Sequence, residues 1–259
     1  MIDIDGLYLK DIKEKVKDLD YEYYPELIEY LAKSGKKTEV KYAETLEKKH
    51  TAYLSELKRL DMMYSFHEHV QSEFNVSNIL CIDEVGRGPL AGPVTVCGVM
   101  ISANPGILYV NDSKKLSEKK RMQILKEAEE KSLRHEIVSL DNNVIDELNI
   151  LNATMSAMKQ VVCRFPDADY VIVDGNKNIP GIDLPQAAIV GGDGKVLGIA
   201  LASIIAKVTR DEFMMQMSEK YPYYGFEHNK GYGTKEHIDG LKNHGACEIH
   251  RRTFIKNFI

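Results

Sequence analysis

The sequence has only four cysteines and no long uninterrupted apolar segment. The cysteines, Cys81, Cys97, Cys163 and Cys247, form no C-x-x-C pair, which argues against a zinc site and against a disulfide framework. No segment approaches the roughly 20 apolar residues that a transmembrane helix needs, and Met1 is followed by acidic residues rather than by a signal peptide. We therefore expect a cytoplasmic protein with reduced thiols and no membrane partner.

The chain also lacks an excess of positive charge. Its 259 residues include 34 Lys and Arg against 39 Asp and Glu, a formal net charge of -5, whereas nucleic-acid-binding domains are usually basic. The objection is limited, because an acidic metal site would account for part of the deficit and because binding depends on where basic groups cluster. The basic clusters are Lys114, Lys115, Lys119, Lys120 and Arg121, then Lys207 and Arg210, Lys230 and Lys235, and Arg251 and Arg252.

The chain is organised around the stretch 79–101. An apolar run at 79–82 predicts a buried strand, which ends in Asp83 and Glu84, and a glycine- and proline-rich turn leads into a second strand at 94–101. An isolated acid pair would simply face solvent. Here, however, the cationic Arg87 and the open backbone N–H groups of the glycine-rich turn follow the acids, and this combination suits a metal ion and a phosphate. Since neighbouring strand residues point to opposite faces, we expect the strand to distort at Glu84.

Two further segments predict acids at the same site. The β-branched run 170–173 ends in Asp174, so two neighbouring strands would bring Asp83 and Asp174 to one edge of a sheet. The segment 199–219 predicts a helix whose positions 203, 207 and 211 share one face. Taken alone, Lys207 and Asp211 would be an ordinary i, i+4 surface pair.

Four motifs resemble signatures of bacterial ribonuclease HII. DEVGRGPLAGP at 83–93 closely resembles the first signature of that family, and ASIIAKVTRD at 202–211 resembles another, whose final aspartate is the fourth active-site acid. DSK at 112–114 and KGY at 230–232 also match. The chain departs from the pattern at Gly191, where many relatives carry lysine.

The resemblance implies an α/β fold, a ribonuclease H-like mixed five-stranded sheet flanked by helices, over residues 73–259. Residues 1–72 lie outside it and are predicted to form a small helical N-terminal extension. The polar segment 66–77, which overlaps the end of the extension, is predicted to be the linker to the catalytic part. That extension either packs on a neighbour or forms an additional substrate- or partner-binding module. We expect a monomer.

The implied activity is that of an endonuclease that hydrolyses RNA in RNA/DNA hybrids. It also cuts 5′ to single ribonucleotides embedded in duplex DNA, as ribonucleotide excision repair requires, and leaves 5′-phosphate and 3′-hydroxyl ends. The acids that would be catalytic and hold two Mg²⁺ or Mn²⁺ ions are Asp83, Glu84, Asp174 and Asp211. The residues that would bind the nucleic acid are Gly86, Arg87, Gly88, Ser113, Lys114, Ser203, Lys207 and Tyr232.

Three alternatives stay open. A type III ribonuclease H shares the acids and the fold but typically lacks the Gly-Arg-Gly element that stands at 86–88. A binding module with a degenerate site is disfavoured because all four expected acids are present. Finally, the closing segment 254–259 loosely matches a docking peptide for a sliding clamp, which we keep as a minor partner hypothesis.

Overall fold

The computed structural model describes residues 6–259, and residue contacts divide the chain into two compact units, Met1–Asp61 and Met62–Ile259. The division falls within the long helix α3 (Lys37–Phe74) rather than after residue 72. The linker expected at 66–77 is wrong, because α3 continues through Phe74. Met63, His67 and Val70 explain the continuation, since they recur at helical spacing and are all buried.

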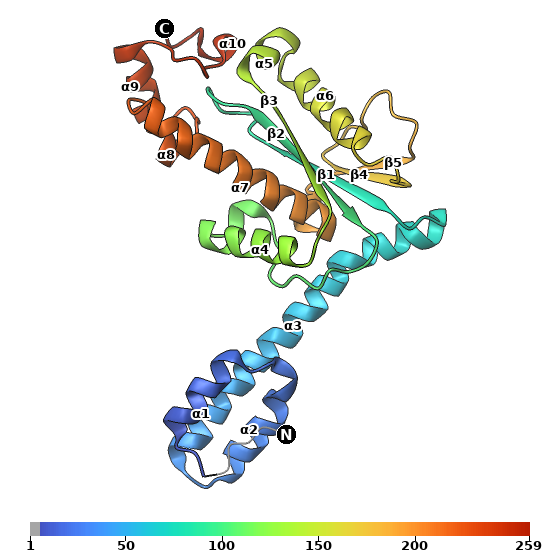
Figure 1. The fold of residues 1–259 in the computed structure, drawn as a ribbon, viewed down its shortest axis with the longest axis vertical. Coiled ribbons are helices and arrows are strands. Elements are labelled where there is room, and N and C mark those ends of the chain that lie inside the picture. The colour runs from blue at the N-terminus through green and yellow to red at the C-terminus, as the bar shows by residue number, and fades with distance from the viewer. Residues whose placement is uncertain (1–5) are drawn as a thin grey trace. The chain divides into compact units, whose positions relative to one another are not determined.

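The N-terminal unit is helical, as expected for the extension. It contains α1 (Leu9–Lys15), α2 (Tyr24–Lys33) and the first part of α3, with short 3₁₀ turns at Val16–Asp18 and Tyr21–Tyr23 (Figure 1). The apolar faces of the three helices form a separate small core. Its fully buried members include Ile12, Leu27, Leu31 and Leu46.

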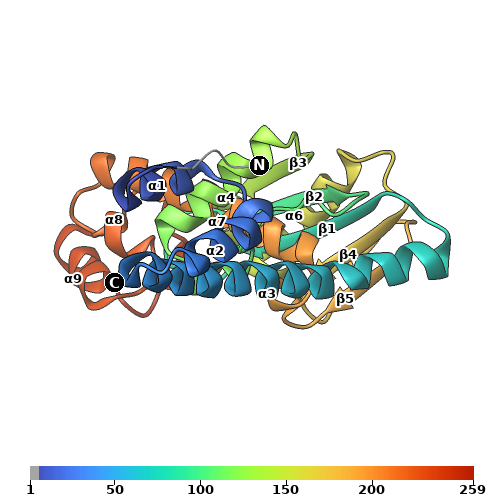
Figure 2. The same ribbon diagram turned by 90° about the horizontal axis from the view of Figure 1, so that it is seen from below.

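The C-terminal unit is built on a mixed five-stranded sheet, which confirms the predicted fold class. The strands are β1 (Ile79–Val85), β2 (Val94–Ile101), β3 (His135–Leu140), β4 (Tyr170–Asp174) and β5 (Gln186–Ile189). Their order across the sheet is β3-β2-β1-β4-β5, and they follow one another in this order in Figure 2. β2 is antiparallel to both of its neighbours, whereas β1, β4 and β5 run parallel, so the ends of these three strands meet at one edge.

Two long helices, α6 (Ile150–Cys163) and α7 (Leu197–Lys220), cover opposite faces of the sheet (Figure 1). Leu80 and Ile82 belong to the apolar cluster formed with α6, whereas Cys81 lies against Gly198 of α7. Alternation along β1 therefore assigns odd-numbered residues to the α7 face and even-numbered ones to the α6 face. α4 (Glu118–Glu130) packs against α7, and the short α5 (Asn142–Leu148) precedes α6.

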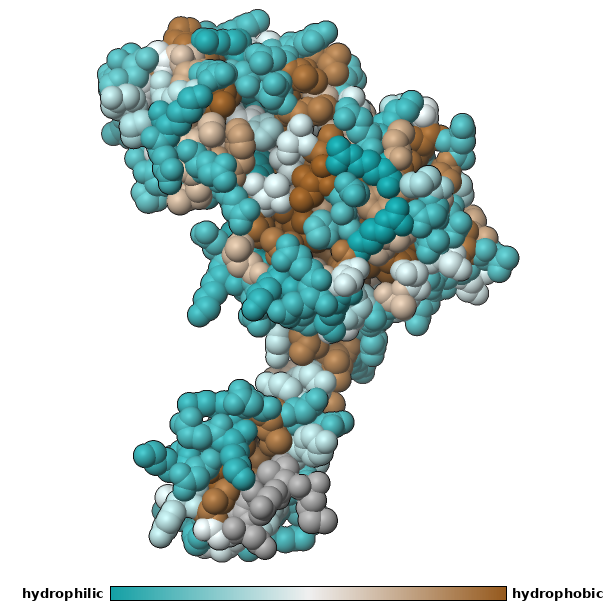
Figure 3. All heavy atoms as spheres, viewed as in Figure 1, coloured by the Kyte–Doolittle hydropathy of each residue, from teal (hydrophilic) through white to brown (hydrophobic). Residues whose placement is uncertain are grey.

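The chain ends in three short helices, α8 (Phe226–Asn229), α9 (Lys235–His244) and α10 (Arg252–Ile255). They gather around an apolar cluster with Leu90, Met214 and Tyr224. The face drawn in Figure 3 is mostly hydrophilic, with apolar patches between the polar groups. Within residues 6–259, no helix combines the length and the apolar character that crossing a membrane requires.

Candidate active site

β1 delivers Asp83 and Glu84 to opposite faces of the sheet. The strand stays paired with β2 through Glu84↔Val96 and Val85↔Thr95, so the distortion expected at Glu84 is wrong. Asp83 therefore lies on the α7 face, where it accepts a hydrogen bond from Ser203. Glu84 lies on the α6 face, and the two acids are neighbours across the end of one strand.

β4 brings Asp174 to the same edge. The parallel register pairs Ile82 with Val173, which places Asp174 next to Asp83 at the end of the neighbouring strand. The Asp174 carboxylate accepts a hydrogen bond from the Gly192 N–H at 2.7 Å, and its charge raises the pKa of both Asp83 and Glu84. The structure thus brings together three of the four acids named from the sequence.

Asp193 is a functional candidate that the sequence analysis missed. It lies in the 3₁₀ turn Gly192–Gly194, which follows β5 and is tied to Asp174 through the Gly192 bond. Burial, Asp112 and Asp174 raise the pKa of Asp193, and the Lys114 Nζ lies 3.7 Å from its carboxylate. The signal was present in the sequence, because a short strand followed by Gly-Gly-Asp repeats the pattern that identified Asp83 and Asp174.

Asp211 is engaged elsewhere. Its carboxylate lies 2.5 Å from Lys207 Nζ and 3.6 Å from Arg121 Nη2, and none of its interactions in the described part of the chain is with Asp83, Glu84 or Asp174. Ser203, which contacts Asp83, precedes Asp211 by eight residues, a rise of about 12 Å along α7. The structure therefore does not support the assignment of Asp211 as the fourth acid, and it directs Lys207 toward Asp211.

The acids repel one another. Burial, followed by the charges of Glu84 and Asp174, raises the pKa of Asp83 well above its ordinary value, and the Ser203 hydroxyl offsets this in part. Burial also raises the pKa of Glu84, against the opposing effect of Arg87, whose Nη1 lies 3.2 Å from the carboxylate. A divalent cation would relieve this repulsion.

The donor set fits a hard cation. Its members all offer carboxylate oxygens, the ligands that Mg²⁺ and Mn²⁺ prefer, and they are Asp83, Glu84, Asp174 and Asp193. Within residues 6–259, however, no three His, Cys, Asp or Glu side chains already stand in the arrangement of a metal site. Side chains of this set would thus have to adjust around an ion.

Two serines and a lysine border the acids. The hydroxyls of Ser113 and Ser203 lie 3.0 Å apart and both residues are buried, while the Lys114 side chain is largely exposed beside Asp193. Arg121 of α4 donates to the carbonyl of Ser113 at 3.0 Å, which ties this turn to α4. The predicted Ser113, Lys114 and Ser203 therefore lie at the acid edge.

The Gly-Arg-Gly turn lies next to an aromatic ring. Gly86 is buried with φ +90°, a conformation that favours glycine, whereas Arg87 and Gly88 are exposed. A Cβ atom at Gly88 would lie 3.7 Å from Cε1 of Tyr232, whose side chain is 43% exposed. The turn and the ring thus form one surface beside Glu84.

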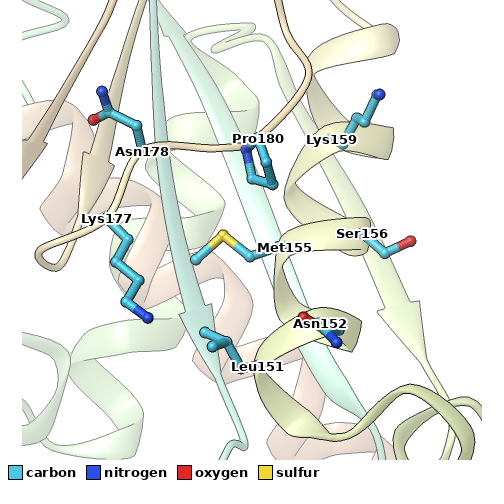
Figure 4. Close-up of a pocket in the computed structure, with 8 residues that line it drawn as sticks. All are labelled: Leu151, Asn152, Met155, Ser156, Lys159, Lys177, Asn178 and Pro180. Atoms are coloured by element: carbon cyan, nitrogen blue, oxygen red, sulfur yellow. The ribbon is translucent and has the colours of Figure 1, made fainter.

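A groove extends from the acids along α6. Its inner part, about 150 Å³, is lined by residues that include Glu84, Arg87 and Asp174, and its outer part, about 480 Å³, is shown in Figure 4. Leu151, Met155 and Lys177 line both parts. Figure 4 shows that the residues lining this outer part come from α6 and from the loop after β4, and its eight labelled residues are Leu151, Asn152, Met155, Ser156, Lys159, Lys177, Asn178 and Pro180. The two lysines make this groove suitable for an anionic chain, which the sequence analysis did not anticipate.

Known proteins resemble the chain over most of its length. The family model of ribonuclease HII matches residues 80–257. A ribonuclease HII of Clostridioides difficile is 44% identical over 252 residues, 97% of this chain and 98% of that protein. One from Acetivibrio thermocellus is 43% identical over 257 residues, 98% of this chain and 99% of that protein.

Solved structures share the fold over about two thirds of the chain. The ribonuclease HII in a complex with PCNA from Archaeoglobus fulgidus has a TM-score of 0.57 and 26% identity, over 70% of this chain and 96% of that one. The ribonuclease H2 of Pyrococcus horikoshii has a TM-score of 0.54 and 23% identity, over 68% and 93% of the two chains.

Proposed function

The chain belongs to the ribonuclease HII family of metal-dependent nucleases, and on this premise we propose that it hydrolyses RNA in RNA/DNA hybrids and cuts duplex DNA 5′ to a single embedded ribonucleotide. The products would carry 5′-phosphate and 3′-hydroxyl ends. The observation that carries the proposal is that an edge of converging carboxylates adjoins the Gly-Arg-Gly turn, whose Arg87 and Gly88 are exposed, and the partly exposed ring of Tyr232. The carboxylates can perform hydrolysis, and the turn together with the ring can identify a ribose.

The hydrolytic centre in this proposal is the set Asp83, Glu84, Asp174 and Asp193. When bound there, two Mg²⁺ or Mn²⁺ ions would supply an activated water and stabilise the leaving oxygen. The Gly192 N–H orients the Asp174 carboxylate, and the Ser203 hydroxyl orients that of Asp83. Lys114 places a positive charge at the rim of the site, where a phosphate of the substrate would approach.

Recognition of the ribose would fall to the Gly-Arg-Gly turn and Tyr232. RNA differs from DNA by its 2′-hydroxyl, which both donates and accepts hydrogen bonds, so backbone groups at 86–88 can identify it. The exposed Tyr232 ring beside Gly88 offers a flat surface for the adjoining sugar or base. Recognition and cleavage would then lie on either side of Glu84.

The partner hypothesis for the C-terminal end is weaker. The Archaeoglobus ribonuclease HII was solved in a complex with PCNA, which is consistent with a sliding-clamp partner for this chain. Phe254 and Phe258, however, pack against the apolar cluster of the C-terminal helices instead of projecting as a docking peptide. We also propose that residues 1–72 act as an extension of the catalytic domain at 73–259.

The test is cleavage of three duplexes that differ only in sugar chemistry. They are all-DNA, DNA with one ribonucleotide, and an RNA/DNA hybrid, each incubated with Mg²⁺ or Mn²⁺ and then with excess EDTA. We expect cleavage of the second and third duplexes, a cut 5′ to the lone ribonucleotide, and full inhibition by the chelator.

Two outcomes would support the alternatives. Cleavage of the hybrid without cleavage at the lone ribonucleotide would favour a type III activity. No cleavage of any duplex, with binding retained, would favour a degenerate binding module.

A further inference from the structure

Two arginines are fully buried behind the Gly-Arg-Gly turn. Arg210 of α7 and Arg251, which precedes α10, are both 0% exposed, and neither forms an ion pair with a carboxylate in the described part of the chain. Burying a guanidinium is costly unless its N–H groups are satisfied. In both residues the acceptors are backbone carbonyls of the loops around the turn.

Arg251 spans the turn with its whole guanidinium. Nη2 donates to the carbonyl of Gly86 at 2.5 Å and to that of Pro93 at 3.1 Å, Nη1 donates to that of Arg87 at 3.0 Å, and Nε donates to that of Gly92 at 3.0 Å. Only arginine offers this many donors in a fixed planar fork. A single side chain therefore fixes the orientation of two consecutive peptide groups in the turn.

These bonds determine where the opposite ends of the same peptide groups point. In a trans peptide the C=O and the N–H point in opposite directions, and the described chain has no cis peptide. Because the carbonyls of Gly86 and Arg87 point inward to Arg251, the N–H groups of Arg87 and Gly88 point away from it. Both residues are exposed, and neither N–H has a protein acceptor among the residues that the structure describes.

We propose that Arg251 is a positioning residue for ribose recognition, which holds the N–H groups of Arg87 and Gly88 outward as donors for the 2′-hydroxyl of the substrate. The inference rests on the proposed function and extends it to a residue outside the predicted site. The guanidinium also polarises both peptide groups, which strengthens the N–H donors on the far side. Arg251 itself touches no substrate in this arrangement.

The segment that carries Arg251 is anchored from two sides. The Asp146 carboxylate of α5 accepts the N–H groups of Arg252 at 2.6 Å and Thr253 at 2.9 Å, which caps α10. On the other side, His250 lies 2.9 Å from His237 between their Nε2 atoms. The position of the fork is thus set by contacts that lie away from the turn.

Arg210 provides a matched control. It is equally buried and donates to the same Pro93 carbonyl at 2.9 Å, and its other acceptors are the carbonyls of Ala91 and Lys230. It donates to neither Gly86 nor Arg87. Replacing either arginine by lysine keeps the charge and removes the fork, so the two variants differ in which carbonyls are released.

The experiment measures kcat/KM for Arg251→Lys and Arg210→Lys on the lone-ribonucleotide duplex and on the RNA/DNA hybrid, with thermal melting of each variant. A hybrid presents a 2′-hydroxyl at every residue of one strand, so imperfect orientation of the donors costs less there. We expect Arg251→Lys to lower the ratio of lone-ribonucleotide to hybrid cleavage about tenfold, the loss of roughly one charge-assisted hydrogen bond. Arg210→Lys should lose similar thermal stability and keep the wild-type ratio.

An unchanged ratio in Arg251→Lys, or an equal fall in both variants, would overturn the role of Arg251. If Arg251→Lys does not fold, Asp146→Ala decides, because it releases the same segment from a half-buried site. Its matched control is Asp141→Ala, which removes the cap of α5 at the Val144 N–H and leaves α10 untouched. A reduced ratio only in Asp146→Ala supports the proposal, and unchanged ratios in both overturn it. A wild-type protein that never cuts at a lone ribonucleotide would overturn the proposed function as well.

Discussion

Replacing Asp193 and Asp211 one at a time tests which of the two carboxylates serves as the fourth acid of the hydrolytic centre. We expect Asp193→Asn to lower kcat/KM on a hybrid by at least about 100-fold, the upper range for altering groups that support a bound metal. We expect Asp211→Asn to retain most of the activity. The two substitutions remove the same charge and conserve the same shape, so each serves as the control for the other.

The order of the two substitutions should be reversed for stability: Asp211→Asn should destabilise the protein more than Asp193→Asn does. Asp211 is paired with Lys207 and Arg121, and all three side chains are mostly buried. Loss of these pairs should cost about 2 kcal/mol, between the values for exposed and fully buried pairs. At about 2–4 °C per kcal/mol, the melting temperature of Asp211→Asn should fall by about 4–8 °C.

Asp193→Asn should instead keep or raise the melting temperature of the metal-free protein. The raised pKa of Asp193 means that its charged form is disfavoured in the folded state, so removing the charge relieves repulsion from Asp112 and Asp174. The assay is steady-state cleavage in Mg²⁺ combined with melting in EDTA. An inactive Asp211→Asn with wild-type stability, together with an active Asp193→Asn, would refute the reasoning and restore the prediction from the sequence.

Three further predictions address binding, recognition and pH. Asp174→Asn should abolish cleavage while duplex binding, measured by fluorescence anisotropy, stays near wild type, and an equal loss of both would contradict a catalytic role. Tyr232→Ala should slow cleavage at a lone ribonucleotide about tenfold, since base stacking contributes about 1–3 kcal/mol, while Tyr232→Phe should remain active; unchanged rates in Tyr232→Ala would exclude the ring from the site. Burial and the neighbouring His237 lower the pKa of His250 to about 4 in the folded protein. As the pH falls below about 6.5, the unfolded chain therefore binds the proton first, and the stabilisation present above that pH is lost as the pH approaches 4. Through this residue the free energy of unfolding, measured in urea, should be about 2 kcal/mol lower at pH 5 than at pH 7; His250→Gln should lack this contribution, and identical pH dependence in both proteins would contradict the assignment.

The part of the site carried by strands could be predicted from the sequence. An apolar run that ends in an acid specifies both the strand and the point at which its side chain emerges, so Asp83 and Asp174 were found together. The same rule applied to β5 would have found Asp193. The expectation for Glu84 failed because it assumed that both acids must share a face, whereas the structure keeps the strand regular and places the acids on two faces of its end.

The part carried by α7 could not be predicted in the same way. Helical spacing identifies the residues that share a face, and Ser203, Lys207 and Asp211 do follow that spacing. Spacing does not say which turn of the helix lies at the sheet edge, because that depends on packing between elements distant in sequence. The structure places Ser203 beside Asp83 and leaves Asp211 with Lys207 and Arg121.

The structure changes the estimate of the charge that is available for nucleic-acid binding in two ways. Arg210 and Arg251 belong to the basic clusters of the sequence, but both are buried, and each donates to the carbonyl of Pro93, which lies more than 100 residues away in the sequence. The basic surface is therefore smaller than composition suggests. The acidic excess shrinks as well, since two divalent cations would add four positive charges to a formal net charge of -5. With its metals bound, the protein would approach neutrality, and the acids that argue against nucleic-acid binding in the composition are those that the chemistry requires.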